Sequence, residues 1–330
     1  NPMKRAWIAL VMLLALVLAG CTPSPQPTPS PTAAAPTTTK AQPSPTPSPT
    51  PEPSPSAIDP LPEGPVNALL FGTDSRVSGD MTGNADTIML VHVPADRSAV
   101  YLISLTRDMW VPIPGLGEGK LNAAFARGGT QTLVDTVSQL LGGIEIDFVA
   151  QSNFEGFIAV TRALDGIPVV NKHFSSVTVN STGRLVEFPE GEIVLTGTDG
   201  LIYVRERKRL PLGDLDRTER QRAAVIGMMT KIASFKDDPA KLSGVLAMLI
   251  MNVKITGDFD LLTATQLVPM MSELTQEDVV GLMVPITGFG DRNGASVNLV
   301  DLEQTAALGE AIRTDSLPSY IATYGLDYAP

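Results

Sequence analysis

The stretch Val66-Asn-Ala-Leu-Leu-Phe-Gly-Thr-Asp-Ser-Arg76 decides how the folded domain is interpreted, because a short apolar segment ends directly in polar residues. Val66 to Gly72 is typical of a buried β-strand. Two further apolar segments follow, at Thr87 to Val93 and at Ala99 to Leu105, and a turn at 95–98 precedes the third. These segments predict three strands, each followed or preceded by polar residues.

Strands and helices alternate over the rest of the chain. Thr130 to Leu141 places its leucines and valines on one helical face, and Gly142-Gly143 ends that helix. The remaining predicted elements are a strand at Asp147–Gln151, a helix at Phe154–Leu164, a strand at Ile167–Val170, an irregular or hairpin-like stretch at 171–195, a helix at Thr196–Val204, a long helix capped by Asp216 or Thr218 and running to about Phe235, helices at Lys241–Asn252 and Leu261–Ser272, a strand at Val279–Ile286 and a helix near Leu302–Ile312. This alternation predicts an α/β fold, a three-layer α-β-α sandwich with a central mixed sheet.

The first 21 residues have the pattern of a lipoprotein-type signal peptide. Lys4 and Arg5 precede an apolar run from Ala6 to Gly20, which as a helix would rise about 22 Å. A membrane core is roughly 30 Å thick, so the run favours a signal segment over a permanent span. The run ends in Leu18-Ala-Gly-Cys21, which is similar to the lipobox of bacterial lipoproteins, and Cys21 is the chain's only cysteine. The alternative is an uncleaved short anchor with an incidental cysteine.

Residues 22–60 differ in composition from everything that follows. Pro, Ser, Thr and Ala dominate them, and such a segment buries too little apolar surface to fold. We therefore expect a disordered, extended tether that reaches on the order of 100 Å and joins the lipidated end to one folded domain at 61–330.

Positive charge is concentrated in one place against the overall charge of −11. Residues 205–222 hold seven of the 24 Lys and Arg side chains. Arginine forks bind phosphate oxygens and stay charged when partly buried, so the cluster indicates an anion site. The alternative is a charged helix face held by pairs such as Glu206–Arg209. With this negative overall charge, we expect no nucleic-acid partner.

Polar groups also gather at the ends of the first three predicted strands. Asp74 follows the first, Asp86 opens the second, and Arg107-Asp108 follows the third. Strand ends are where α/β sheets usually bind ligands, and Mg²⁺ commonly takes one or two carboxylates together with water and phosphate oxygens. The alternative is that these aspartates cap turns.

Few residues indicate a catalytic or binding site of another kind. His92 and His173 lie far apart without metal-ligand spacing, which argues against zinc, and no serine has an evident histidine partner. The chain has no phosphate loop of the common nucleotide-binding kinds. Met228, Met248, Met251, Met270 and Met283 are predicted core residues, and some of them are candidates to line a groove for a lipid tail.

Six stretches occur in an order that we can assign to a family. They are Asn67–Arg76, Ala85–Leu90, Ile103–Asp108, Lys120–Phe125, Asn153–Phe157 and Tyr203–Gln221. Together they resemble the LytR–CpsA–Psr family of bacterial cell-wall proteins, from about residue 66 to 235 and more loosely to the end. The family's members are membrane-attached, extracytoplasmic phosphotransferases that move a glycopolymer from a polyprenyl-pyrophosphate carrier onto peptidoglycan.

The resemblance implies roles for particular residues. Asp74 and Asp86 would be the carboxylates associated with Mg²⁺ (or Mn²⁺), and with Arg107 they would form the catalytic set. The pyrophosphate would be contacted by Arg76, Arg107, Lys120, Arg205, Arg207, Asp214, Arg217 and Gln221, with the polyprenyl tail in an apolar tunnel between sheet and helices. Lys208, Arg209 and Arg222 remain as solvated charges.

Two departures from the family pattern stand out. Many relatives carry an arginine before the second strand where this chain has Asn84-Ala85, so one phosphate-side arginine is missing. Relatives usually carry a transmembrane helix, whereas Cys21 predicts a lipid anchor at the outer face of the membrane. The same predicted site would also serve a polyprenyl-pyrophosphate phosphatase or a non-catalytic lipoprotein that binds polyprenyl phosphates, and both remain alternatives.

Overall fold

The computed structural model describes residues 61–77, 79–259, 263, 266 and 275–326. The predicted signal segment, Cys21 and the tether at 22–60 lie outside these residues, as does almost all of the predicted helix Leu261–Ser272. Among the described residues, none of the helices combines the length and the apolar character that crossing a membrane requires.

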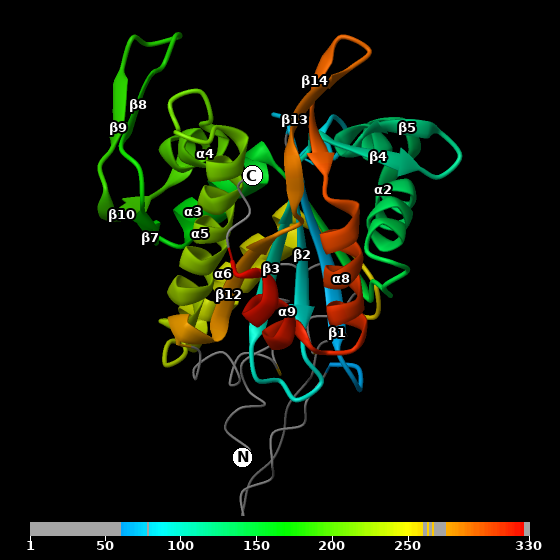
Figure 1. Ribbon diagram of the computed structural model, residues 1–330. Coiled ribbons are helices and arrows are strands. Elements are labelled where there is room, and N and C mark those ends of the chain that lie inside the picture. Colours follow the sequence, from blue (N-terminus) through cyan, green and yellow to red (C-terminus); the bar gives the residue numbers. More distant parts are fainter. Residues whose placement is uncertain (1–60, 78, 260–262, 264–265, 267–274, 327–330) are drawn as a thin grey trace, which may run out of the picture.

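A six-stranded mixed sheet forms the centre of the molecule (Figure 1). Its strands run in the order β11-β6-β1-β2-β3-β12, with the antiparallel pairs β11/β6, β1/β2 and β2/β3 and the parallel pairs β6/β1 and β3/β12. The strand bounds are β1 Val66–Thr73, β2 Ala85–Val93, β3 Val100–Leu105, β6 Phe148–Asn153, β11 Val253–Thr256 and β12 Val279–Met283.

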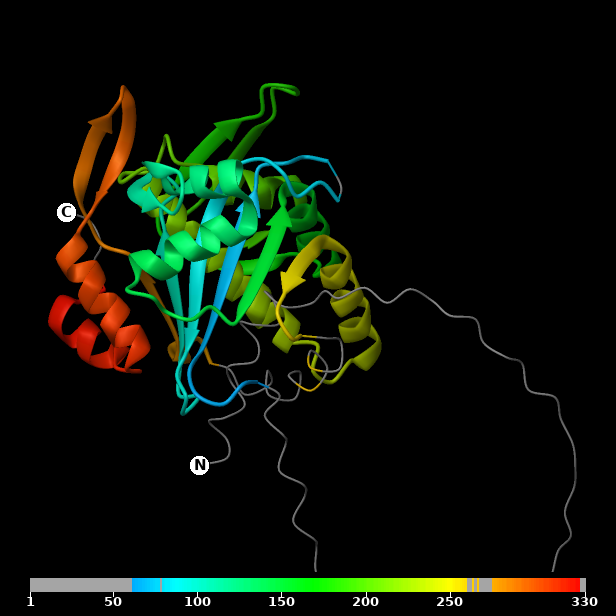
Figure 2. The ribbon, with the colours of Figure 1, turned by 90° about the vertical axis from the view of Figure 1, so that its right-hand side faces the viewer.

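Helices cover both faces of this sheet, which confirms the predicted three-layer sandwich (Figures 1 and 2). One face packs on α3 (Phe154–Ala163), α4 (Gly197–Arg205), α5 (Asp214–Ala233) and α6 (Pro239–Asn252), and the other on α2 (Leu121–Leu140), α8 (Leu302–Arg313) and α9 (Leu317–Tyr324). Neighbouring strand residues alternate between the two cores: Ala68 and Met89 lie in the first, Leu69 and Leu90 in the second. Because both faces are buried, the other strands are continuous apolar runs, which is why the sequence predicted them, whereas the edge strand β11 was not predicted.

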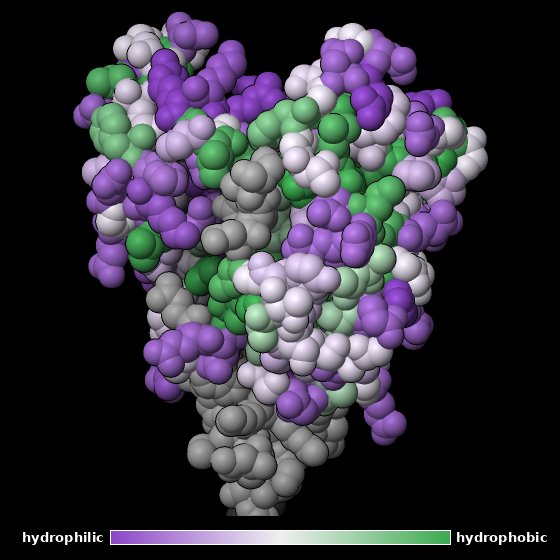
Figure 3. Space-filling view, in the orientation of Figure 1, coloured by the Kyte–Doolittle hydropathy of each residue, from purple (hydrophilic) through white to green (hydrophobic). Residues whose placement is uncertain are grey.

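Smaller sheets surround this centre and were not predicted as separate sheets. A four-stranded sheet has the order β13-β14-β4-β5, and two pairs, β7/β10 and β8/β9, lie on the other side of the molecule. Their bounds are β4 Met109–Ile113, β5 Gly117–Lys120, β7 Ile167–Asn171, β8 Ser175–Thr178, β9 Leu185–Phe188, β10 Gly191–Leu195, β13 Ile286–Arg292 and β14 Ala295–Val300. The β8/β9 and β13/β14 hairpins project past the same end of the central sheet, and Figure 3 shows a notch between the two projections.

Several predicted boundaries were wrong. Helix α2 starts at Leu121, but Gly129 (φ 77°) has non-helical dihedral angles that kink it, so the predicted start at Thr130 marks its second segment and the segment before Gly129 was not predicted. Neither Asp216 nor Thr218 caps α5, which begins after Gly213; instead Asp216 Oδ2 accepts a hydrogen bond from Leu212 N one turn back, at 2.7 Å. The predicted strand at Val279–Ile286 contains the whole of β12, Val279–Met283, and runs on to the first residue of β13.

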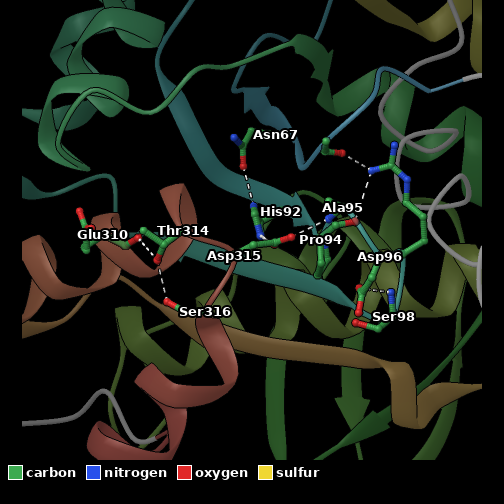
Figure 4. A network of polar contacts seen from close by, with 12 residues as sticks. Asn67, His92, Pro94, Ala95, Asp96, Ser98, Glu310, Thr314, Asp315 and Ser316 are labelled. Carbon is green, nitrogen blue, oxygen red and sulfur yellow. Dashed lines mark hydrogen bonds and ion pairs between the residues drawn. The ribbon is translucent and has the colours of Figure 1, made fainter.

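At the far end of β1 and β2, a buried histidine joins the sheet to the α8–α9 turn (Figure 4). His92 is fully buried, with Nδ1 2.8 Å from Asn67 Oδ1 and Nε2 3.1 Å from Asp315 Oδ1. Asp315 Oδ2 also accepts a hydrogen bond from the Ala95 backbone N–H at 2.7 Å. His92, for which no function was predicted, therefore has a structural role, because it connects the sheet to the α8–α9 turn.

Candidate functional site

Asp74 lies at the end of β1 in a tight loop that returns to the start of β2. Its two carboxylate oxygens accept hydrogen bonds from the backbone and side-chain nitrogens of Asn84, at 2.8 and 3.1 Å. Asn84 occupies the position where many relatives are expected to have an arginine, so here the loop is fixed by a neutral side chain. A Cβ at Gly83 would lie 2.3 Å from Asp74 Oδ1, so the close approach requires glycine there. Partial burial raises the pKa of Asp74, but the Asn84 hydrogen bonds and the charge of Arg205 outweigh it and lower that pKa.

Asp86 and Arg107 form an ion pair across neighbouring strands, since one opens β2 and the other follows β3. Their side chains keep 11% and 21% of their surface exposed, so the pair stands at the surface of a partly open site. Burial works to lower the pKa of Arg107, but the carboxylates of Asp86 and Asp108 outweigh it and raise that pKa. Asp108 in turn accepts a hydrogen bond from Lys120 Nζ at 2.8 Å, which brings the end of β5 into the site.

The side chains described so far form one wall of the site, and the end of α4 and the start of α5 form the second. The Arg205 guanidinium lies 4.3 Å from the centroid of the Phe154 ring, which holds it over the first turn of α3 while the residue remains exposed. Arg217 is buried and pairs with Asp214 at 2.5 Å. Burial lowers the pKa of Arg217 and raises that of Asp214, in each case against the opposing charge of the partner.

Electrostatic coupling shows that the two walls face one space. The charges of Arg76, Asp86, Asp74 and Arg107 act on the pKa of Arg205. The charge of Arg217 is influenced by Asp214, Arg107, Asp86 and Arg207. The cluster therefore combines six cations with four carboxylates, a local excess of positive charge in an acidic protein: Arg76, Arg107, Lys120, Arg205, Arg207 and Arg217 with Asp74, Asp86, Asp108 and Asp214.

Some polar atoms of this cluster are buried without a hydrogen-bond partner. Among the described residues, these include Arg107 Nε, Arg217 Nε and Asp214 Oδ2. Proteins rarely leave buried donors unsatisfied, and the exceptions concentrate at functional sites. The cluster is thus organised for binding an anion rather than for the stability of the fold.

An apolar cavity of about 1040 Å³, including its open mouth, begins at this cluster. Asp86, Arg205, Arg217 and Gln221 stand at its polar side, and Gln221 Nε2 donates to Val204 O at 3.3 Å. The interior lies between the central sheet and helices α3 to α6, and its lining includes Met89, Phe157, Val160, Leu201, Met228 and Leu249. Met228 therefore lines the groove that the sequence analysis suggested, whereas Met251 is 76% exposed and not a core residue.

For only some residues of the arginine cluster did the sequence predict correctly whether the side chain is solvated. Lys208 and Arg209 are exposed, and Arg209 pairs with Glu206 at 3.7 Å, as predicted. Arg222 was predicted to be solvated and is buried, with Nη1 donating to Ser104 Oγ at 2.7 Å. Arg220, for which no role was predicted, lies 4.2 Å from the Tyr203 ring centroid and donates to Asn171, His173 and Ser175. Helical spacing alone does not separate these residues, because Arg220 lies only about 60° around α5 from Arg217.

The donor set near Asp74 and Asp86 suits magnesium. No three His, Cys, Asp or Glu side chains gather closely enough to hold a metal within the described part of the chain. Two carboxylates that face the same arginine are nevertheless sufficient for Mg²⁺, which keeps water and phosphate oxygens in its shell. The depressed pKa of Asp74 keeps it anionic, as a metal ligand requires.

Comparisons with known proteins agree with this geometry. The sequence profile of the LytR_cpsA_psr family matches residues 32–314. The cell wall biosynthesis protein LcpA of Corynebacterium glutamicum is 29% identical over 303 residues, which cover 76% of this chain and 57% of LcpA. The Bacillus subtilis polyisoprenyl-teichoic acid–peptidoglycan teichoic acid transferase TagU is 35% identical over 201 residues, 59% of this chain and 61% of TagU. The matches thus span about three fifths of the length of these curated relatives.

Solved structures give the same assignment. B. subtilis TagV superposes with a TM-score of 0.64 at 25% identity and covers 82% of this chain and 100% of TagV. TagT, in a structure described as bound to LIIa-WTA, superposes with a TM-score of 0.63 at 26% identity, covering 78% of this chain and 92% of TagT. A matching profile over most of the chain, this fold, and the family's polar stretches gathered around one cavity lead to one conclusion: the chain belongs to the LytR–CpsA–Psr family.

Proposed function

We propose that this protein is an extracytoplasmic phosphotransferase that moves a glycopolymer from a polyprenyl-pyrophosphate carrier onto peptidoglycan. One observation carries the proposal: an apolar cavity has at its polar side Arg205 and Arg217, which belong to the cluster of six cations. A polyprenyl pyrophosphate has the same division into an apolar chain and a compact, highly charged head. The family relationship to TagU and LcpA supports the same substrate class.

The reaction joins an acceptor sugar hydroxyl to the phosphorus that carries the polymer. A new O–P bond forms, the bond to the bridging oxygen of the pyrophosphate breaks, and polyprenyl phosphate leaves with that oxygen. The hydroxyl proton is released to a base or to solvent. Arg107, Arg205 and Arg217 stabilise the negative charge on the phosphoryl oxygens, because their positions are fixed by Asp86, Phe154 and Asp214 before the substrate binds.

Mg²⁺, or Mn²⁺ in its place, belongs to this proposal as the bound cation at Asp74 and Asp86. It would supply neutralising charge to the pyrophosphate. The chain's own contribution is to hold two carboxylates beside the arginine wall, with the loop at Asp74 fixed by Asn84. The lowered pKa of Asp74 makes its carboxylate a weak base and therefore a poor proton acceptor for a sugar hydroxyl.

The decisive experiment measures where a label in the polymer is found after the reaction. Lipid-linked polymer labelled in its sugars is incubated with the full-length protein, Mg²⁺ and isolated peptidoglycan. A transferase leaves label covalently on the wall and releases polyprenyl phosphate. Release of polymer phosphate into solution without wall label would instead identify a pyrophosphatase, and a pyrophosphatase side activity is expected at low level when peptidoglycan is omitted.

The cavity can be tested separately through the length of the lipid. Ala224 lines it, whereas its neighbour Ala223 lies about 100° around α5 and lines a separate hollow beside β7. We expect Ala224→Phe to weaken transfer from a long-chain carrier far more than from a short-chain analogue, and Ala223→Phe to affect both equally little. An equal loss with both lipids in the Ala224 variant would contradict a tail in this cavity.

We propose further that lipidated Cys21 anchors the protein to the outer face of the membrane. The lipobox-like Leu18-Ala-Gly-Cys21 and the proline-rich tether motivate this proposal. Growth with radioactive fatty acid should label the wild-type protein and leave Cys21→Ala unlabelled. An unlabelled wild type would refute the anchor.

A further inference from the structure

An aromatic ring stands beside the cation cluster on a surface to which the proposed reaction gives no role. In β4 and β5, side chains alternate between two faces. Met109, Val111 and Ile113 are buried in the core that α2 shares. The opposite face carries Pro112 and Glu118, both exposed, and between them and the site lies Trp110, which is half-buried. This face of the small sheet is therefore open to solvent next to the cluster.

Lys120, the cross-strand neighbour of Trp110, is connected to the arginine wall by two polar contacts. Trp110 pairs across the ladder with Lys120 in the antiparallel register of β4 and β5. Lys120 Nζ donates to Asp108 Oδ1 at 2.8 Å, and Asp108 Oδ2 lies 3.7 Å from Arg107 Nε. Trp110 and Asp108 are two residues apart, about 7 Å along an extended chain. The sheet register thus places Trp110 beside Lys120, whose ammonium contacts the carboxylate next to Arg107.

The ring is surrounded by hydrogen-bonding groups at its edge. The indole Nε1 lies 3.5 Å from Glu118 Oε2, and Lys120 is the cross-strand neighbour of Trp110. A pyranose has the matching chemistry, because its C–H groups form an apolar face with partial positive charge while its hydroxyls point outward. The negative face of an aromatic ring attracts such C–H groups.

We propose that Trp110 is the stacking platform for the pyranose ring linked to, or attacking, the reacting phosphorus. The inference rests on the proposed function and assigns it a sugar subsite. Its position agrees with the direction of the lipid, since the cavity lies on the α3–α6 side of the central sheet whereas β4 packs on the α2 side. Tail and sugar therefore leave the cation cluster toward opposite faces.

The chain allows a direct optical test. Its only two tryptophans are Trp7 and Trp110, so in a full-length Trp7→Phe protein all tryptophan fluorescence comes from Trp110. Three probes are titrated: a polyprenyl pyrophosphate without sugar, the same lipid bearing a disaccharide, and a soluble peptidoglycan glycan fragment. A fluorescence change with a sugar-bearing probe that exceeds the change with sugar-free lipid supports the platform. No excess with either sugar source overturns it.

Kinetics of the transfer reaction separate stacking from a structural role. We expect Trp110→Ala to raise the KM for one sugar source about tenfold with kcat within about twofold, and Trp110→Phe to restore most of the loss. Phe289→Ala is the matched control, because Phe289 is an exposed aromatic of the same small sheet, 57% accessible. A raised KM for the lipid-linked polymer assigns the donor sugar to Trp110, and a raised KM for peptidoglycan assigns the acceptor.

Two outcomes would overturn the inference in distinguishable ways. If Trp110→Ala weakens binding of sugar-free polyprenyl pyrophosphate as much as that of sugar-bearing lipid, Trp110 only positions Lys120 and Asp108. If wild-type protein transfers polymer and Trp110→Ala matches it in both KM values, the platform alone is refuted. A wild type that binds no polyprenyl pyrophosphate would refute the proposed function, and the platform with it.

Discussion

Polar side chains lie at both ends of strand β2, and the two ends differ in how completely their polar atoms are hydrogen-bonded. At its start, Asp86 meets Arg107, both side chains keep some exposure, and Arg107 Nε has no hydrogen-bond acceptor among the described residues. At its other end, His92 is fully buried, and both ring nitrogens lie near oxygen atoms of Asn67 and Asp315.

The difference separates a functional site from a structural joint on one strand. A fully satisfied buried network rigidifies the fold, and here it fixes the α8–α9 turn to the sheet (Figure 4). A partly exposed cluster with unsatisfied donors retains binding capacity for a ligand. Substitutions at the two ends should therefore affect different measurements, activity at one and stability at the other.

The largest effect is expected at the open end. Arg107→Ala should lower the rate of polymer transfer by about 10²- to 10³-fold, because a fixed charge that stabilises the phosphoryl oxygens is removed. Wall-bound label measures the rate, and Arg209→Ala, which removes an exposed cation of the same region, is the control expected to behave as wild type. A loss of lipid binding with normal wall labelling in cells would point instead to a non-catalytic binding protein.

The metal requirement should give a smaller change at the same end. Chelation should abolish transfer, and Mg²⁺ or Mn²⁺ should restore it. Asp86→Asn should raise the Mg²⁺ concentration for half-maximal activity about tenfold, because one anionic ligand becomes neutral. Isothermal titration of Mg²⁺ with a lipid pyrophosphate analogue present gives an independent measurement, and an unchanged affinity would exclude Asp86 as a ligand.

The closed end should respond through stability. His92→Leu should lower the free energy of unfolding by about 2 kcal/mol, since Asn67 and Asp315 lose their common partner inside the fold. Urea unfolding measures the loss, while transfer at low temperature should stay within about twofold of wild type. His173→Leu is the matched control, because the His173 side chain is 39% exposed and should cost little. A selective loss of activity in the His92 variant would break the distinction between the two ends.

The smallest effect is a pH dependence from the same histidine. Burial lowers the pKa of His92, although the charge of Asp315 opposes the shift. The unfolded chain, with an ordinary histidine pKa of about 6.5, then binds more protons than the folded chain below that pH. Stability should be complete above about pH 6.5 and fall as the pH drops toward the folded-state pKa. His92→Leu should lose this slope; a wild type that gains stability on acidification would contradict the assigned direction.

The sequence predicted the central sandwich because strands buried on both faces are unbroken apolar runs and helices carry one apolar face. It failed at the four-stranded sheet, since β4 and β5 are short, with Pro112 and three glycines among them. Such segments resemble turns in sequence and become strands only when they pair with each other and with β14. It also misplaced the start of α5, because the capping preferences of Asp216 and Thr218 yielded to contacts with Leu212 and Leu215.

For this protein, the sequence by itself determined the residue types of the site, their order and the family, because polar residues at strand ends and an arginine cluster are local features. Only the tertiary structure decided which arginines share the site. Arg217 and Arg222 are five residues apart on one helix, yet one faces the cavity mouth and the other contacts Ser104 on β3. The direction of a side chain depends on what packs against each face of its helix, and that is fixed by long-range contacts.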